Sequence, residues 1–258
     1  MPFDKWVIEN ILETLHFHKP ARSVYRALFG SAGRRRRKQL KDFYAPLIKA
    51  GDLVYDVGAN IGVYSEIFCS LGANVVAFEP IPDCARELKR WLPKDKATVI
   101  EAAVGSGPGV GHLHLSNVRS SSSMSDDWRE TVERSPLSKT IHWVRDLEVR
   151  IVTLDEISKE HGTPQYIKID VEGYEEPVLD GLSWQPPLLS FEFHKETIGS
   201  ALRCLTKPCI LKDSVFNFLL GEPGHFQYDH WVSLNQLTQT LSKLDREHGF
   251  GDIFIRKP

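Results

Sequence analysis

Seven short apolar runs alternate with amphipathic helical patterns along most of the chain, and this alternation restricts the fold more than any other feature. Runs of this length, bounded by turn residues, are typical of buried strands. Where helices separate such strands, the sheet is mainly parallel and is covered by helices. The runs lie at 53–57, 74–78, 98–102, 166–169, 188–193, 210–220 and 252–255. The sequence therefore predicts an α/β fold.

Two features add antiparallel pairs to this fold. Between the third and fourth runs lies a long insertion with alternating segments at 112–115 and 147–154, which are expected to pair as a ribbon. The four serines at 120–123 separate them and predict a mobile loop. A Gly-Glu-Pro-Gly turn at 221–224 lies between two late runs and predicts a C-terminal hairpin.

The first 50 residues have a different pattern. Apolar residues at steps of three and four predict helices at 3–17, 24–29 and 40–48. A segment of this size is too small for a core of its own, so it is expected to pack on the larger domain after it. We predict a helical extension at 1–50 and one domain at 51–258, in which 105–150 forms an insertion or lid.

Composition narrows the possible partners. The chain has 32 basic and 34 acidic residues among 258, so its net charge of −2 offers no general attraction to nucleic acid or membranes. A basic run from Arg34 to Lys38 is a local exception, although such runs are usually solvated helix faces. The chain has four cysteines without a CxxC pair and shows no secretory signal, which favours a cytoplasmic protein. It also has no apolar run of ~18 residues, so we expect no membrane span.

A glycine loop after the first run is the clearest ligand motif. Gly58 and Gly62 are four apart, and Asp56 precedes the first of them by two residues. Dinucleotide sites usually have the closer GxGxxG spacing, whereas this spacing suits a ligand with a carboxylate and an ammonium group. Glu79 ends the second run, where a carboxylate can accept hydrogen bonds from both hydroxyls of a ribose. Together these residues predict a pocket for S-adenosylmethionine (SAM).

Two further acidic clusters follow later strands. Asp170 and Glu172 come after the fourth run, and alternation places them on the same side. Glu192 and His194 likewise share a side at the end of the fifth run. Ligands bind beyond the carboxyl ends of such strands, so these side chains are expected beside the cofactor's methyl group. The structural alternatives are that Glu172 caps the next helix and that His194 is a strand-end residue satisfied by the backbone.

These motifs, taken together, resemble the FkbM-type family of SAM-dependent methyltransferases. The matching segments, in the family's order, are VYDVGANIGVYS at 54–65, FEP at 78–80, VTLD at 152–155, IKIDVEGYE at 167–175 and GDIF at 251–254. The resemblance covers roughly residues 40 to 258. It implies a class I methyltransferase fold, which is Rossmann-like with a mostly parallel seven-stranded sheet, and methyl transfer to hydroxyl oxygens of polyketides, sugars and related metabolites.

The resemblance also implies roles for single residues. Asn60 would order the glycine loop or meet the methionine end of the cofactor, and Ala102 and Ala103 would border the adenine. The complete predicted cofactor-binding set is Asp56, Gly58, Asn60, Gly62, Glu79, Ala102, Ala103 and Asp170.

For catalysis we predict His194 as a neutral general base, with Asp170 orienting its ring and Glu172 beside them. The same three residues, Asp170, Glu172 and His194, offer two carboxylates and an imidazole, so a divalent metal is the less favoured alternative.

The leading functional hypothesis is a small-molecule O-methyltransferase acting on a hydroxyl of a sugar, glycolipid or polyketide-like metabolite. A nucleic-acid methyltransferase is suggested only by the basic run, and the Asn/Asp-Pro-Pro-aromatic motif of amino-methylating enzymes is absent where Asp170-Val171-Glu172-Gly173 stands. A third hypothesis is a SAM-binding protein without catalytic activity.

Overall fold

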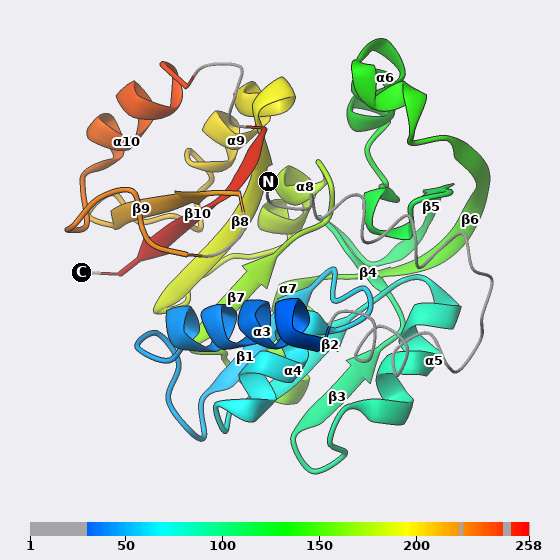
Figure 1. The fold of residues 1–258 in the computed structure, drawn as a ribbon, viewed down its shortest axis with the longest axis horizontal. Coiled ribbons are helices and arrows are strands. Elements are labelled where there is room, and N and C mark those ends of the chain that lie inside the picture. The colour runs from blue at the N-terminus through cyan, green and yellow to red at the C-terminus, as the bar shows by residue number, and fades with distance from the viewer. Residues whose placement is uncertain (1–29, 222–223, 245–248, 258) are drawn as a thin grey trace.

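A seven-stranded sheet forms the centre of the computed structural model, which describes residues 30–221, 224–244 and 249–257 (Figure 1). Its strand order is β3-β2-β1-β7-β8-β10-β9. The strands are β1 (Leu53–Val57), β2 (Asn74–Phe78), β3 (Ala97–Ile100), β7 (Tyr166–Ile169), β8 (Leu188–His194), β9 (Val215–Leu220) and β10 (Phe250–Arg256). Strand β10 is antiparallel to both neighbours, and all other pairs are parallel. The predicted sheet with its antiparallel C-terminal pair is confirmed.

The C-terminal pair differs from the prediction in two details. Strand β9 begins at Val215 instead of residue 210 because the preceding residues form a turn. In that turn, Gln185 Oε1 accepts hydrogen bonds from Leu211 N at 2.6 Å and from Ser214 Oγ at 3.0 Å. The connection from β9 to β10 is longer than a tight hairpin, since it contains helix α10 (Leu234–Leu241).

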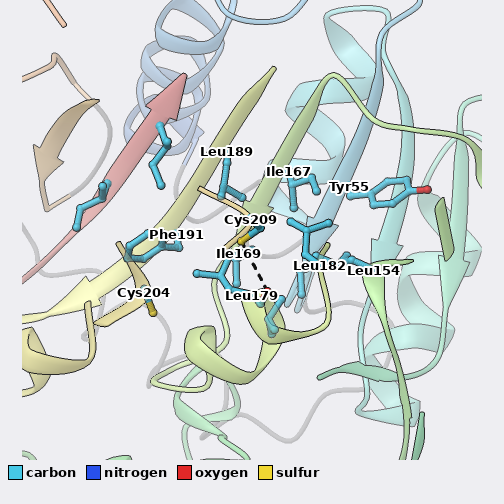
Figure 2. Packing of buried hydrophobic residues seen from close by; sticks show 14 of the residues in the cluster. Tyr55, Leu154, Ile167, Ile169, Leu179, Leu182, Leu189, Phe191, Cys204 and Cys209 are labelled. Carbon is cyan, nitrogen blue, oxygen red and sulfur yellow. Dashed lines mark hydrogen bonds between the residues drawn. The ribbon is translucent and has the colours of Figure 1, made fainter. Parts of the chain in front are cut away.

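Helices cover both faces of the sheet. One face packs against α3 (Gly30–Tyr44), α4 (Val63–Ser70) and α5 (Pro82–Trp91), and the other against α7 (Leu154–His161), α8 (Glu175–Asp180), α9 (Ile198–Cys204) and α10. Alternation along β1 separates the two cores, because Val54 packs on the first side and Tyr55 on the second. Figure 2 shows the second core, where Cys209 Sγ donates to Leu179 O.

The basic run lies inside helix α3, which runs unbroken from Gly30 to Tyr44. The helix predicted at 40–48 was therefore wrong in its bounds, and those predicted at 3–17 and 24–29 lie outside the described residues. Arginine and lysine are good helix formers, and the buried side chains of Leu40, Phe43 and Tyr44 anchor this helix on the sheet. Within the described ranges, no helix has the length and apolar character needed to cross a bilayer.

The insertion, with the residues on either side of it, forms a second, smaller sheet in the order β4-β6-β5. Its strands are β4 (Ala103–Val104), β5 (Gly109–Ser116) and β6 (Trp143–Val152), with helix α6 (Asp126–Arg134) between β5 and β6. Strands β5 and β6 are antiparallel, which confirms the predicted ribbon. The serine run is not an irregular loop: it includes a short 3-10 helix at Arg119–Ser121, and Ser123 exchanges main-chain hydrogen bonds with His114.

Candidate active site

A cavity of about 190 Å³ lies at the carboxyl ends of β1, β2 and β7. Three loops form much of its wall, at 58–61, 79–81 and 170–172. The insertion contributes a further side through Leu113, Arg119 and Met124. Open α/β sheets bind their ligands at this edge, so the cavity lies where the sequence predicts the cofactor.

The glycine loop has a backbone that only small or specialised residues adopt. Gly58 has φ +84° and Gly62 has φ +78°, both in the left-handed region, as does Asn60 at 49°. A Cβ at position 62 would lie 2.4 Å from Leu88 Cδ2, so this glycine allows the loop to pack against α5. Gly58 and Asn60 line the cavity, whereas Gly62 supports it from behind.

Glu79 places a buried carboxyl group in the cavity wall, with 3% of its surface exposed. Its Oε2 accepts a hydrogen bond from Asn60 N at 2.8 Å, and its Oε1 accepts one from Ile81 N at 2.8 Å. Burial raises the pKa of Glu79 to about 7, and the two backbone hydrogen bonds oppose this shift. Each oxygen keeps a lone pair for a ligand hydroxyl.

Asp56 does not line the cavity, although the sequence predicted it as a cofactor contact. It is 1% exposed and accepts a hydrogen bond from Ser65 Oγ at 2.6 Å. Burial raises the pKa of Asp56, while the charge of Lys168 lowers it. The side chain points to the α4 side of the sheet because alternation along β1 turns it away from the strand tip. Asp56 therefore supports the site from behind.

Asp170 and the two alanines that the sequence analysis assigned to the adenine lie in the cavity wall. Ala102 and Ala103 are both buried and line the cavity. Asp170 lines it too, and its Oδ2 accepts a hydrogen bond from Lys168 Nζ at 2.7 Å. Lys168 is a residue that the sequence reasoning missed, although a lysine inside an apolar strand was a signal. Its side chain is 1% exposed, so the pair fixes the Asp170 carboxylate.

Lys168 carries its charge in spite of burial. Desolvation alone would lower the pKa of Lys168, but the charges of Asp170 and Asp252 raise it well above its ordinary value. Its Nζ also lies 4.2 Å from the centre of the Tyr64 ring, and Tyr64 is part of the cavity wall. The charged, buried Lys168 thus contacts two residues of the cavity wall, Asp170 and Tyr64, from inside the protein.

A second group of polar side chains gathers beside the cavity. The Oε2 atoms of Glu172 and Glu192 lie 3.3 and 3.2 Å from His194 Nε2. The His194 ring packs against Trp128 with ring centroids 4.3 Å apart. The structure thus brings together Glu172 and His194, with Glu192 as the third member in place of Asp170. Alternation along β8 was the signal for Glu192.

The two carboxylates determine the charge of His194 in this arrangement. Burial would lower its pKa, but Glu192 and Glu172 raise the pKa well above its ordinary value. In the absence of a bound cation, the two carboxylates favour the protonated form of the ring, whereas the sequence hypothesis assigned a neutral imidazole.

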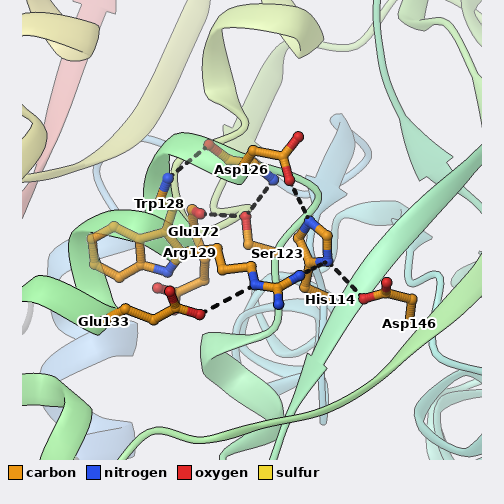
Figure 3. A network of polar contacts seen from close by, with 9 residues as sticks. His114, Ser123, Asp126, Trp128, Arg129, Glu133, Asp146 and Glu172 are labelled. Atoms are coloured by element: carbon orange, nitrogen blue, oxygen red, sulfur yellow. Dashed lines mark hydrogen bonds and ion pairs between the residues drawn. The ribbon is translucent and has the colours of Figure 1, made fainter.

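The insertion is joined to this group through a polar network (Figure 3). His114 Nδ1 lies 2.7 Å from Asp146 Oδ1, and its Nε2 lies 2.9 Å from Asp126 Oδ1. Ser123, which pairs with the His114 main chain, donates its Oγ hydrogen to the Glu172 carbonyl oxygen at 2.7 Å. The position of Glu172 therefore depends on the insertion as well as on β7.

Comparison with known proteins identifies relatives of the chain. The family model described as "Methyltransferase FkbM domain" matches residues 56–250. The hexuronic acid methyltransferase AglP of Haloferax volcanii is 33% identical over 138 residues, which are 51% of this chain and 50% of that protein. The matched region thus spans about half the length of this curated relative.

The comparison with solved structures also finds two distant matches. A SAM-dependent O-methyltransferase from Thermotoga maritima is 13% identical, with a TM-score of 0.42 over 84% of this chain and 64% of that one. A precorrin-6y C5,15-methyltransferase from Geobacter metallireducens is 12% identical, with a TM-score of 0.39 over 86% and 88% of the two chains.

Proposed function

The chain belongs to the FkbM methyltransferase family, and from this premise we propose that it transfers a methyl group from SAM to a hydroxyl oxygen of a sugar or related metabolite. The observation that supports this most is the cavity at the strand tips, which combines the glycine loop, the buried carboxyl of Glu79 and Asp170 in one wall. Because the hexuronic acid methyltransferase AglP is a relative, an acidic sugar is the first acceptor to test.

The cavity wall fits the chemistry of the cofactor. The Glu79 carboxylate would accept hydrogen bonds from the ribose hydroxyls, since both of its oxygens retain lone pairs. The loop at 58–62 would hold the amino-acid portion, and the small side chains of Ala102 and Ala103 leave room for the adenine. When bound, SAM supplies an electrophilic methyl group. The remaining tasks belong to the chain, which must orient the acceptor and provide a path for its proton.

The cluster of Glu172, Glu192 and His194 is the part of the chain that we assign to the acceptor. Glu172 lies in the cavity wall, so an acceptor hydroxyl beside the cofactor can come within hydrogen-bond distance of its carboxylate. His194 Nε2 lies 3.3 Å from that carboxylate, and Glu192 lies 3.2 Å from the same nitrogen. This assignment replaces the predicted role of Asp170 as the residue that orients His194, because Asp170 is hydrogen-bonded to Lys168.

The test is methyl transfer to defined acceptors. The protein is incubated with methyl-labelled SAM and either an oligosaccharide that ends in a hexuronic acid or the same oligosaccharide with a neutral hexose. We expect labelled product, and mass spectrometry should locate one added methyl group on the terminal sugar. The matched variants are Glu79→Ala, which should lose transfer, and Glu130→Ala, which alters an exposed glutamate paired with Arg134 on α6 and should retain it. Absence of label from both sugars and from hydroxylated metabolite extracts would overturn the proposal.

A further inference from the structure

We infer that Glu172, Glu192 and His194 form a binding site for one divalent cation that accepts both oxygen and nitrogen ligands. One ligand atom from each residue lies within 4.8 Å of the other two. The set differs from the one that the sequence suggested, because Glu192 takes the place of Asp170. Only the role of this ion toward the acceptor rests on the proposed methyl transfer; its binding does not.

Two of the distances in the cluster match those between ligands around an ion, and all three ligand atoms lie within 4.8 Å of one another. Metal–ligand bonds of about 2.1 Å in tetrahedral or octahedral geometry place neighbouring ligand atoms about 3.0–3.4 Å apart. His194 Nε2 lies 3.3 Å from Glu172 Oε2 and 3.2 Å from Glu192 Oε2. A cation can therefore bind between them with only small side-chain movements.

Two atoms of the cluster form an ion pair at 3.2 Å without hydrogen-bond geometry, which is a second sign. Glu192 is 5% exposed, and among the described residues neither its Oε2 nor Nε2 of His194 has a partner with hydrogen-bond geometry. Buried polar atoms nearly always have such partners, and an absent ion is one of the recognised reasons for an exception. The two atoms are neighbours, so one ion would satisfy both.

The protein fixes these ligands through contacts that leave the ligand atoms available. Glu172 has a left-handed backbone with φ 54°, an unfavourable conformation for glutamate. The loop is held in this form by Glu175 Oε1, which accepts hydrogen bonds from Val171 N at 3.2 Å and from Gly173 N at 3.1 Å. The His194 ring is held by its packing on Trp128. Such support is typical of metal ligands, whose surroundings orient them.

The donor set selects the class of ion. Carboxylates suit Mg²⁺, Ca²⁺ and Mn²⁺, whereas imidazole suits Zn²⁺ and Fe²⁺, so a mixed set favours Mn²⁺, Fe²⁺ or Zn²⁺. Three protein ligands leave at least one coordination position open. Because Glu172 lies in the cavity wall, an open position on that side would be available to an acceptor oxygen.

The experiment measures cation binding without the methyl-transfer reaction. Protein treated with EDTA and dialysed is titrated with Mn²⁺, and the free ion is followed by electron paramagnetic resonance. We expect one Mn²⁺ per chain, displaced by Zn²⁺. Glu192→Gln and His194→Ala should each weaken Mn²⁺ binding at least tenfold. Replacing a residue that only supports a metal ligand commonly lowers metal affinity 10–100-fold, and replacing a ligand should lower it at least as much. Glu130→Gln, on the surface of α6, should bind as the wild type does.

Two results would overturn the inference. The first is that the free Mn²⁺ signal stays unchanged with excess wild-type protein and that Zn²⁺ also fails to bind in calorimetry. The second is that the Glu192→Gln and His194→Ala variants bind Mn²⁺ as tightly as the wild type. The first result would mean that the cluster is an imidazolium held between two carboxylates. Circular dichroism and S-adenosylhomocysteine binding verify that the variants are folded. If S-adenosylhomocysteine binds and Mn²⁺ does not, the cation site fails, whereas the cofactor pocket of the proposed function stands and methyl transfer is decided by the acceptor assay.

Discussion

A Cβ atom at position 58 would lie 1.8 Å from the carbonyl oxygen of Asp170, so Gly58 and Asp170 are in main-chain contact across the cavity wall. The φ of Gly58 is +84°, which other residues rarely adopt. The loop after β1 and the loop after β7 are therefore one packed unit, and a change in the first must move the second.

Gly58→Ala should damage both stability and cofactor binding. The added methyl group cannot fit without a backbone shift, so the free energy of unfolding should fall by more than ~2 kcal/mol and S-adenosylhomocysteine affinity at least tenfold. Urea denaturation and calorimetry measure these quantities. The matched control is Gly107→Ala, since no atom lies within 4 Å of a Cβ there. Equal behaviour of the two variants would contradict the packed unit.

Cofactor affinity should depend on pH through Glu79. Its pKa is raised to about 7 by burial, and ribose hydroxyls would hydrogen-bond to the ionised form. Affinity for S-adenosylhomocysteine should therefore increase between pH 6 and pH 8, and Glu79→Gln should lose this increase. Calorimetric titrations over that range provide the test, and a flat profile in the wild type would count against the assignment.

The stability of the ligand-free protein should change in the opposite sense. A carboxyl group whose folded pKa is raised stabilises the fold most below its ordinary pKa, which is 4.5 for Glu79. This contribution is lost as the pH rises through about 7. Replacing Glu79 with glutamine removes the ionisable group, so the decline in unfolding free energy over this range should be smaller in Glu79→Gln, as measured by urea denaturation.

Lys168→Met should lower the free energy of unfolding by about 3–5 kcal/mol, because it removes the buried lysine that pairs with the Asp170 carboxylate. Lys89→Met removes an exposed lysine that pairs with Glu101 at 3.1 Å, and should cost no more than about 1 kcal/mol. Thermal and urea denaturation of the two variants measure the difference. Similar losses in both would show that the Lys168 pair does not stabilise the cavity wall.

The strands were predictable where a buried apolar run was uninterrupted. Strands β1, β2 and β7 begin and end where the sequence predicted them. The start of helix α3 was misjudged because the apolar pattern begins only at Leu40, and the basic run before it has no such pattern. The packing of Leu40 and Phe43 on the sheet anchors the helix.

The site was predictable where it depends on local sequence. The glycine loop and Glu79 follow strand ends, so their place at the cavity was accessible from the sequence. Alternation along β8 placed Glu192 beside His194, but the sequence did not predict that Glu172 joins this pair, because this depends on the left-handed backbone at Glu172. The wall residues Arg119 and Met124 come from the insertion, whose docking is a tertiary event.

Ser123→Ala should affect turnover more than cofactor binding. It removes the hydrogen bond to the Glu172 carbonyl oxygen, so the free energy of unfolding should fall by about 0.5–1.5 kcal/mol. The rate constant kcat should fall by up to about tenfold. Affinity for S-adenosylhomocysteine should stay within about twofold. Ser138→Ala, which removes a comparable hydrogen bond to Ser135 O, should leave both unchanged. A parallel fall in affinity and kcat for Ser123→Ala would mean that the serine acts on the whole cavity.

Calorimetric titration with S-adenosylhomocysteine tests the central claim most directly, because it needs no knowledge of the acceptor. The account predicts one molecule bound per chain, with affinity reduced in Glu79→Ala by the ~1.5–3 kcal/mol of a hydrogen bond to a charged group and unchanged in Glu130→Ala. Absence of saturable binding, or equal affinity in the wild type and Glu79→Ala, would contradict it.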